Sequence, residues 1–392
     1  MELLEERWTS YWAEGFDMNL FTNGYAWYFL LLIVFEFVLL NQKKMYVSAN
    51  TPPDTPLNYD KGYDYRVNVF FAILVFLPLI FIAANRGYHA DTFLYITMFN
   101  EYPSNVSELA DFVDWEGKCP GFIVFSVIIK QIFGPDYKPW LFIIAAISAG
   151  ALAIAYKRYT SEVVLCAFFY FASTDFTSWM INGMRQFLVA AILFVCFPLL
   201  EKKKTFLLFV LIALVLYTMH TSVIVVIPLY IAALGKPFNK KTMISLGLML
   251  IAIVFAGQFL GLMDSALEDT AYNGVISQFE GDDGTNIFRV LLYSVPAILA
   301  IVYRKKIPDD VPNIIGICIN MSLITMGLYV LSMFTSGIYI GRMPIYFSLF
   351  NYILLPWEIR TFFPGSRSSM NYAMIGGYLA FYIIQNMFWG NI

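Results

Sequence analysis

Long apolar runs recur along the whole chain, and this pattern constrains the fold more than any other feature. Because lipid offers the backbone no hydrogen-bond partner, runs of this kind cross a membrane as α-helices. Charged residues make up only 14% of the 392 residues, whereas soluble domains carry roughly 25%. We therefore predict an all-α polytopic membrane protein with about 12 transmembrane helices, forming a single integral membrane domain over residues 1–392. The predicted spans are 24–40, 67–84, 139–156, 163–180, 186–200, 205–219, 222–235, 242–262, 287–303, 313–337, 343–357 and 370–389.

One further apolar run, 119–133, is ambiguous because it is short, begins with Pro120 and Gly121, and carries Lys130. The positive-inside rule bears on whether it crosses. If it crosses, the basic pairs and triplets that follow it fall on the outside. If it stays on one side, every basic cluster falls on the inside. We therefore predict a re-entrant or interfacial helix at 119–133.

This choice places both chain ends outside. It also predicts two long external loop regions. The first, 85–138, contains the interfacial helix, and the second, 263–286, is rich in acidic residues. Because acidic residues have little influence on topology, their distribution describes these loops and does not test the prediction.

All but eight of the 25 lysines and arginines then lie inside, and topology does not explain the exceptions. Arg86, Arg185 and Arg342 each adjoin the outer end of a predicted span. His89 and His220, the two histidines of the chain, lie on the same side. The eight exceptions are Arg7, Arg86, Lys118, Lys130, Lys138, Arg185, Arg289 and Arg342.

Three guanidinium groups and two imidazoles at one membrane face indicate a particular chemistry. Arginine presents a planar fork that matches phosphate oxygens and keeps its charge. Neutral histidine can accept a proton from a hydroxyl group. The combination suits a lipid phosphate or pyrophosphate. We expect Arg185, Arg342 and Arg86 to bind pyrophosphate, His220 to be the catalytic base with His89 and Asp91 as the alternative, and Gln186, Tyr95, Ser222 and Tyr346 to contact the substrate.

Simpler structural explanations remain open for these residues. An interfacial arginine can extend its charge to the lipid headgroups. Thr221 or Ser222 could only cap the next helix, and Asp91 could form an ion pair with Arg86 or His89. The acidic segment EGDDGTN (280–286) could bind a divalent cation, although an acidic turn of this kind is more often simply solvated.

Other features exclude several classes of function. The net charge of −3 does not favour a nucleic-acid partner. Four cysteines, at positions 119, 166, 196 and 318, are isolated and lack the spacing of a metal or redox site. We predict no metal and no cofactor. The first 20 residues do not resemble a cleavable signal peptide.

Five short stretches together resemble the EpsG family of bacterial exopolysaccharide proteins, which is related in role to the Wzy-type polymerases. They occur in the usual order of the family and span most of the chain. That family typically has an acidic residue before Pro-Gly-Phe, where this chain has Cys119, so no role is carried over for that acid. The stretches are NRGYHADTFLY (85–95), CPGFIVFSVIIK (119–130), NGMRQFLVAAI (182–192), HTSVIVVIPLY (220–230) and GRMPIYFSLFNYILLP (341–356).

The resemblance implies a membrane glycosyltransferase. Such an enzyme polymerises undecaprenyl-pyrophosphate-linked oligosaccharide repeat units into exopolysaccharide, capsule or O-antigen at the outer face of the bacterial cytoplasmic (inner) membrane. Its partners would be the lipid-linked oligosaccharide, membrane lipids, a chain-length regulator and a flippase.

Two other classes of function share the expected cationic pocket. A transporter or flippase of lipid-linked oligosaccharide would favour broken helices near mid-membrane and functional residues at both faces. Another outer-face transferase, either a glycan ligase or an acyltransferase, would give a single transfer or an acyl ester. A structural scaffold would not need basic residues on one side.

Overall fold

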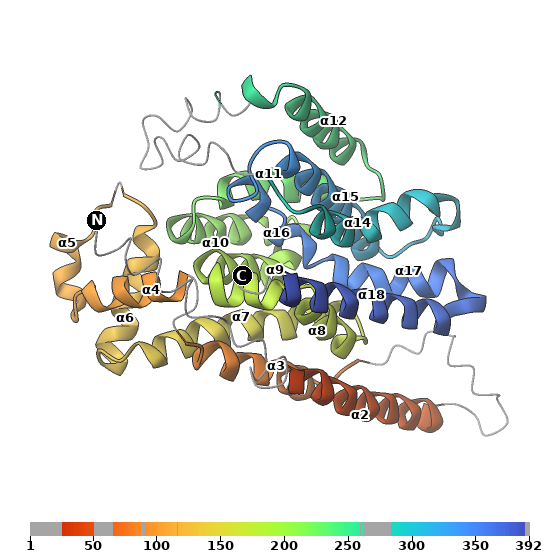
Figure 1. The fold of residues 1–392 in the computed structure, drawn as a ribbon, viewed down its shortest axis with the longest axis horizontal. Coiled ribbons are helices and arrows are strands. Elements are labelled where there is room, and N and C mark those ends of the chain that lie inside the picture. Colours follow the sequence, from red (N-terminus) through yellow and green to blue (C-terminus); the bar gives the residue numbers. More distant parts are fainter. Residues whose placement is uncertain are drawn as a thin grey trace.

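A computed structural model describes residues 26–50, 66–87, 91–115, 117–258, 261 and 284–388, and their regular structure is helical throughout (Figure 1). The longer helices run roughly along the long axis of the molecule. Their bounds are α2 (Ala26–Asn50), α3 (Val69–Ala84), α4 (Asp91–Glu101), α5 (Leu109–Phe112), α6 (Pro120–Phe133), α7 (Tyr137–Tyr159), α8 (Val163–Ala172), α9 (Met184–Glu201), α10 (Phe206–Met219), α11 (Val223–Ala233), α12 (Lys240–Val254), α14 (Ile287–Val302), α15 (Asn313–Met333), α16 (Ile345–Ser348), α17 (Asn351–Phe362) and α18 (Arg367–Phe388).

Helix length and composition support membrane spans for part of this set. Among the described residues, three helices, α7, α9 and α15, are long and apolar enough to cross a membrane. The number rises to four if the bent pair 163–172 and 176–182 is counted as one span. Other apolar helices are shorter: α3 has 16 residues, α10 has 14 and α11 has 11. The predicted all-helical class is confirmed, but the count of about 12 spans is not.

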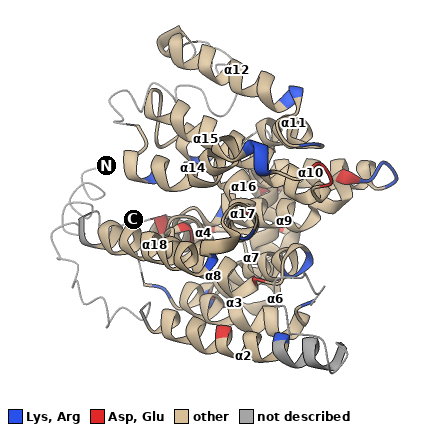
Figure 2. Ribbon diagram, turned by 90° about the vertical axis from the view of Figure 1, so that its right-hand side faces the viewer, with Lys and Arg blue, Asp and Glu red and all other residues tan. Residues whose placement is uncertain are grey.

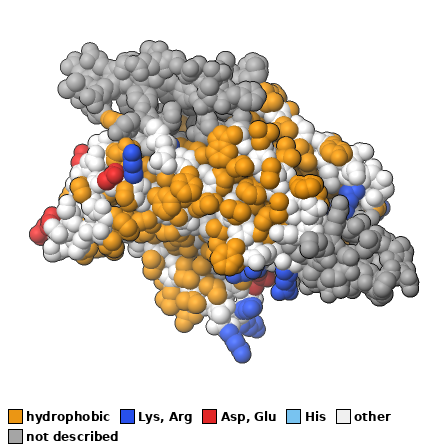
Figure 3. Space-filling view, turned by 90° about the horizontal axis from the view of Figure 1, so that it is seen from below, with side chains coloured by type: hydrophobic (Ala, Val, Ile, Leu, Met, Phe, Trp, Pro, Cys, Tyr) orange, Lys and Arg blue, Asp and Glu red, His pale blue; other side chains and the backbone are white. Residues whose placement is uncertain are grey.

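Side chains on the surface agree with a multi-pass membrane protein. Large hydrophobic residues lie exposed on several helices, including Phe70 (78% exposed), Leu207 (68%) and Val254 (75%). Figure 3 shows such side chains across the middle of one face, with charged side chains gathered toward its margins. A protein in water rarely exposes so extensive an apolar surface, whereas lipid solvates it.

The helices bring sequence-distant segments together at two opposite ends of the molecule. At one end (left in Figure 1) lie α4, α5 and α6. At the other, Lys43 of α2 binds Glu162 at 2.9 Å, and Arg360 of α17 approaches the same carboxylate at 3.7 Å. Figure 2 faces this second end, where Lys and Arg segments are scattered over the helix ends. We call it the basic end, and the opposite one the loop end.

The predicted span 163–180 is not one straight helix, which corrects the sequence prediction. Helix α8 ends at Ala172, and a π-helix, η2 (Phe176–Asn182), follows at an angle of 81°. Thr174 adopts a left-handed conformation at the bend, with φ of 68°. A β-branched residue is strained in this region, so tertiary contacts must stabilise the bend.

Helix α6 was predicted to be a re-entrant or interfacial helix at 119–133, and its residues Lys130 and Ser126 form hydrogen bonds near the loop end. The Lys130 ammonium donates to the backbone carbonyls of Phe99, Asn100 and Tyr102 at 2.5–3.0 Å. It therefore caps the C-terminus of α4. Trp140, at the start of α7, donates from Nε1 to Ser126 at 3.0 Å. These contacts are compatible with a helix that does not cross, and the topology itself stays a prediction.

Candidate functional site

Arg185 and Arg342 share an electrostatic environment with Asp91 and His220 at the loop end. Arg185 lies in the first turn of α9, and Arg342 ends the 3-10 helix η5 (Ile340–Arg342). Burial raises the pKa of the Asp91 carboxyl, while the charges of Arg342 and Arg185 oppose that rise. The same two charges act on His220. Four predicted site residues from four segments are thus close enough to affect one another.

His220 begins a chain of hydrogen bonds that ends at the backbone of Arg342. Its Nδ1 lies 2.7 Å from Ser222 Oγ, which lies 2.7 Å from the Tyr346 hydroxyl. The Gln186 side chain also hydrogen-bonds that hydroxyl. Gln186 Nε2 donates to the Arg342 carbonyl at 2.9 Å. The chain therefore fixes the imidazole relative to both arginine-bearing segments.

The direction of this chain depends on the tautomer of His220, because the hydroxyl groups of Ser222 and Tyr346 can each donate or accept. The backbone N–H of Ser222 also donates to His220 Nδ1 at 3.4 Å. In either tautomer one ring nitrogen of the neutral imidazole carries a lone pair that can accept a proton.

The charge state of His220 follows from its surroundings. Burial, followed by the charges of Arg185 and Arg342, lowers the pKa of His220 from 6.5 to about 3. The imidazole is therefore neutral near neutral pH. It can accept a proton without first losing one.

Helix α4 supplies the remaining acid and a tyrosine. Asn182 Oδ1 accepts the Asp91 backbone N–H at 3.0 Å, which ties the start of α4 to the end of η2. Tyr95 packs edge-on against the Phe122 ring at 6.4 Å. The guanidinium of Arg185 lies 5.8 Å from the centre of the same ring. A cation over an aromatic face is stabilised by the ring quadrupole, so Phe122 helps to place Arg185.

Arg86 differs from the other two predicted pyrophosphate ligands. It is 8% exposed, and its Nε donates to Thr92 Oγ1 at 3.0 Å. One terminal nitrogen donates to Ala83 O, and the other lies 2.8 Å from Met184 Sδ. Its donors are directed at the protein. Arg86 joins α3, α4 and α9, and so it holds together the segments that carry Asp91 and Arg185.

The remaining predictions on site residues have mixed outcomes. His89, Asp282 and Asp283 lie outside the described residues. Within the described part of the chain, no group of three or more His, Cys, Asp or Glu side chains could hold a metal ion. Asp91, Tyr95, Gln186, Ser222 and Tyr346 lie with Arg185, Arg342 and His220, and their roles stay predictions.

Comparison with known proteins adds a family to this geometry. A family model described as the EpsG family matches residues 69–391. The chain belongs to the EpsG family. It is the family of Wzy-type polysaccharide polymerases, so membership indicates a polymerase-like, glycosyltransferase-like function in polysaccharide synthesis. The resemblance predicted from five short stretches is confirmed. Neither a curated protein nor a solved structure matches the chain.

The matched region also contains a polar cluster around Asp175, which we did not predict from the sequence. Asp175 is fully buried at the bend before η2. Its carboxyl group accepts hydrogen bonds from the Tyr293 hydroxyl, from the Tyr352 hydroxyl at 2.5 Å and from Trp179 Nε1 at 3.1 Å. Arg289 donates to two hydroxyl groups of the same bend, those of Thr174 and Ser178.

The Asp175 cluster positions the site. It holds η2 in its bent course, and η2 leads directly to Asn182, which binds α4, and to Arg185. The available sequence signal was an aspartate inside an apolar run, in the segment STDF (173–176). A buried acid in a span is a reason to search for partners.

Proposed function

We propose that this EpsG-family protein polymerises polyprenyl-pyrophosphate-linked oligosaccharide repeat units at the outer face of the cytoplasmic membrane. One observation carries the proposal: Arg185 and Arg342 lie around a neutral histidine and a carboxyl group at the loop end. Two fixed cations beside a proton acceptor suit a reaction whose leaving group is a pyrophosphate.

The arginines have the charge and shape for that leaving group. The donor is a growing glycan joined through its first sugar to a polyprenyl pyrophosphate. Negative charge accumulates on the pyrophosphate as the bond from the anomeric carbon to the phosphate oxygen breaks. Guanidinium groups of Arg185 and Arg342 offer paired N–H donors to those oxygens. They favour the transition state because they are already in place.

His220 is the general base in this proposal. A sugar hydroxyl of the acceptor repeat unit attacks the anomeric carbon of the donor, and a new glycosidic bond forms. The hydroxyl proton passes to the unprotonated ring nitrogen of His220, and the electron pair of the broken bond leaves with the lipid pyrophosphate. The hydrogen-bonded chain through Ser222 and Tyr346 stabilises the resulting imidazolium at Nδ1.

Substrate binding would itself prepare this base. In the empty site, burial and then the charges of Arg185 and Arg342 hold the pKa of His220 at about 3. A bound pyrophosphate offsets those positive charges, so the pKa rises toward the value of 6.5 that histidine normally has. A base gains strength as its pKa approaches the working pH. The imidazole is then most basic when the substrate is present.

Other residues near the arginines complete the proposed site. Asp91 is the alternative base, and burial raises the pKa of its carboxyl. Tyr95, Gln186, Ser222 and Tyr346 offer hydroxyl and amide groups to the sugars or to the relay. Arg86 contributes through the segments that it joins.

The test uses purified protein in lipid nanodiscs with a lipid-linked repeat unit. We expect His220→Ala to retain substrate binding and to lose about 10²–10⁴ in rate, the usual contribution of a general base. Arg185→Ala should lose binding and polymer together, and Arg185→Lys should recover only part because a point charge lacks the fork. Arg304→Gln, at a loop of the basic end, is the matched control.

Product length distinguishes the rival classes. A polymerase gives a ladder of glycans of increasing length, whereas a ligase or acyltransferase gives a single transfer. A flippase gives no covalent product at all. Normal ladders from both His220→Ala and Arg185→Ala would refute the proposed site.

A further inference from the structure

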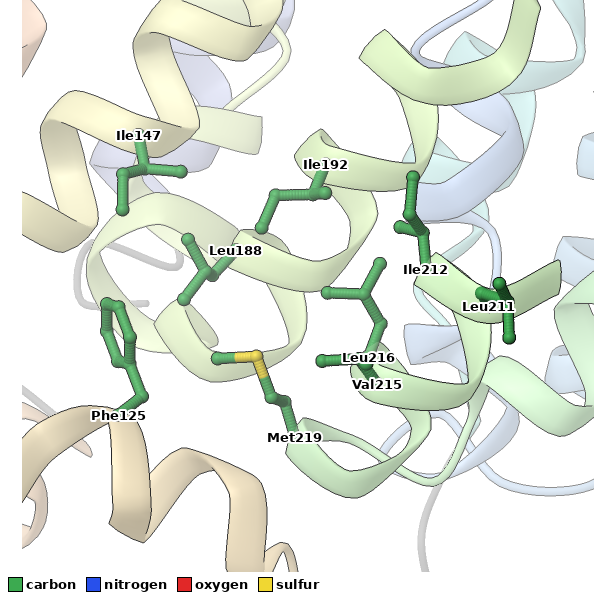
Figure 4. A pocket seen from close by; sticks show the side chains of 9 residues that line it. All are labelled: Phe125, Ile147, Leu188, Ile192, Leu211, Ile212, Val215, Leu216 and Met219. Carbon is green, nitrogen blue, oxygen red and sulfur yellow. The ribbon is translucent and has the colours of Figure 1, made fainter. Parts of the chain in front are cut away.

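An apolar groove between α6, α7, α9 and α10 adjoins the candidate site. Its volume is about 420 Å³, and all nine residues that line it are apolar. Figure 4 shows their side chains converging from α6, α7, α9 and α10. The lining residues are Phe125, Ile147, Leu188, Ile192, Leu211, Ile212, Val215, Leu216 and Met219.

The groove begins where the polar cluster ends, and this continuity is visible on three helices. Leu188 lies one helical turn after Arg185 on α9. Met219 directly precedes His220 at the end of α10. Phe125 lies one turn after Phe122, whose ring lies beside the Arg185 guanidinium. A ligand whose charged head is bound by Arg185 therefore has an apolar path directly beside it.

The groove is open along one flank and closed at its floor. Leu188, Leu216 and Met219 form a floor with at most 8% of each residue exposed. Val215 and Leu211 stand at the mouth, with 64% and 52% exposed. A long chain can enter from the side, with its first part on the floor and its remainder in the bilayer.

We propose that this groove binds the pyrophosphate-proximal isoprene units of the polyprenyl substrate. The inference rests on the proposed function, because it takes the pyrophosphate as the head held by Arg185 and Arg342. A molecule with a doubly charged head and a branched hydrocarbon tail matches a cationic cluster that continues into an apolar channel. The volume accommodates a few isoprene units, so only the part nearest the head is recognised.

Two experiments test the groove. In the first, p-benzoylphenylalanine replaces Val215 at the mouth, or Leu214 as the matched control. Leu214 is the neighbouring residue on α10, is 58% exposed and does not line the groove. The nanodiscs contain radiolabelled geranylgeranyl pyrophosphate. After irradiation we expect label at position 215 at least about tenfold above position 214, because a tail held in a pocket excludes other positions.

Competition identifies what occupies the groove. Unlabelled geranylgeranyl pyrophosphate should abolish the labelling at 215, and Arg185→Ala should reduce it, because the head is no longer held. Equal labelling at both positions, or labelling that the competitor does not reduce, would assign the groove to bulk lipid and overturn the proposal.

The second experiment separates the groove from the reaction. Ile192→Trp fills part of the groove from α9, and Leu214→Trp adds similar bulk outside it. We expect Ile192→Trp to weaken binding of geranylgeranyl pyrophosphate about tenfold or more relative to Leu214→Trp. If polymer formation depends on His220 but is equal in the two tryptophan variants, the proposal for the groove is wrong and the proposed function stands. Specific labelling at 215, with no polymer from the unsubstituted protein, would remove the function and keep the groove.

Discussion

The charge state of His220 gives the sharpest prediction of this structure. Burial and the positive charges of Arg185 and Arg342 lower its pKa to about 3 in the empty site. At a pH of about 6, only about one molecule in a thousand would then carry an imidazolium at this position. With an ordinary pKa of about 6.5, about three quarters of the molecules would carry it. This difference in the protonated fraction of His220 is large enough to be measured by titration.

A direct titration measures this difference without reference to activity. The chain contains only two histidines, so His89→Gln leaves a single imidazole signal in protein labelled with carbon-13 histidine. We expect no titration of His220 between about pH 5 and 8 in nanodiscs that contain the protein alone. Replacing Arg342 with Gln removes one of the two charges, and the midpoint should rise. Arg304→Gln, at the basic end, should leave it unchanged.

The same measurement tests the proposed effect of substrate. Geranylgeranyl pyrophosphate offsets the charges of both arginines, so the midpoint of His220 should rise when it binds. It should stay below 6.5, because the contribution of burial remains. By linkage, the ligand must then bind more tightly as the pH falls through this range.

Two outcomes would refute the reasoning. A midpoint near 6.5 in the empty protein would mean that His220 is solvated and does not sense the arginines. A midpoint that stays the same or falls on addition of the pyrophosphate would mean that the head is bound elsewhere.

Three further substitutions test the support of the site by thermal unfolding. Lys130→Met removes the cap on α4 and leaves three carbonyls without their donor, so we expect a loss of about 1–3 kcal/mol with pyrophosphate binding retained; an unchanged midpoint would contradict the cap. Asp175→Asn replaces an acceptor oxygen with an amide donor that faces hydroxyl and indole donors, and it should cost a similar amount and weaken binding at Arg185; intact binding would limit the cluster to stability. Gly121→Ala would place Cβ 2.1 Å from Thr218 Oγ1 and force α6 away from α10. In the control Gly150→Ala on α7, the added Cβ would have no atom within 4 Å, so this variant should be neutral or stabilising. Equal unfolding temperatures of the two variants would disprove close packing at Gly121.

The central residues of the site could be predicted because each one is unusual at its place in the sequence. Arg185 and Arg342 lie at the ends of predicted spans where the positive-inside rule gives no reason for a positive charge. His220 is one of only two histidines. The all-helical class followed from apolar runs, since runs of this length leave the backbone few alternatives.

The remaining features could not be predicted because they depend on contacts between distant segments. Residues 163–182 contain no glycine or proline that would mark the 81° bend. The bend is stabilised by partners of Asp175 on α14 and α17. The sequence left the charge of Lys130 unexplained, because only the folded structure places the end of α4 beside it. Arg86 met the same criteria as Arg185, but its donors turn toward the protein.

The shortness of α10 has a consequence for where the reaction would take place. Its 14 residues rise about 21 Å, at 1.5 Å per residue, whereas the hydrocarbon core of a bilayer is about 30 Å thick. If α10 stands upright with the lysines at 202–204 level with one set of headgroups, as the predicted topology has it, His220 would stop about 9 Å short of the opposite edge of the core. In the proposed function, the sugars would then have to reach the imidazole from the water below the membrane surface. The lipid tail would approach from within the bilayer, at right angles to the sugars.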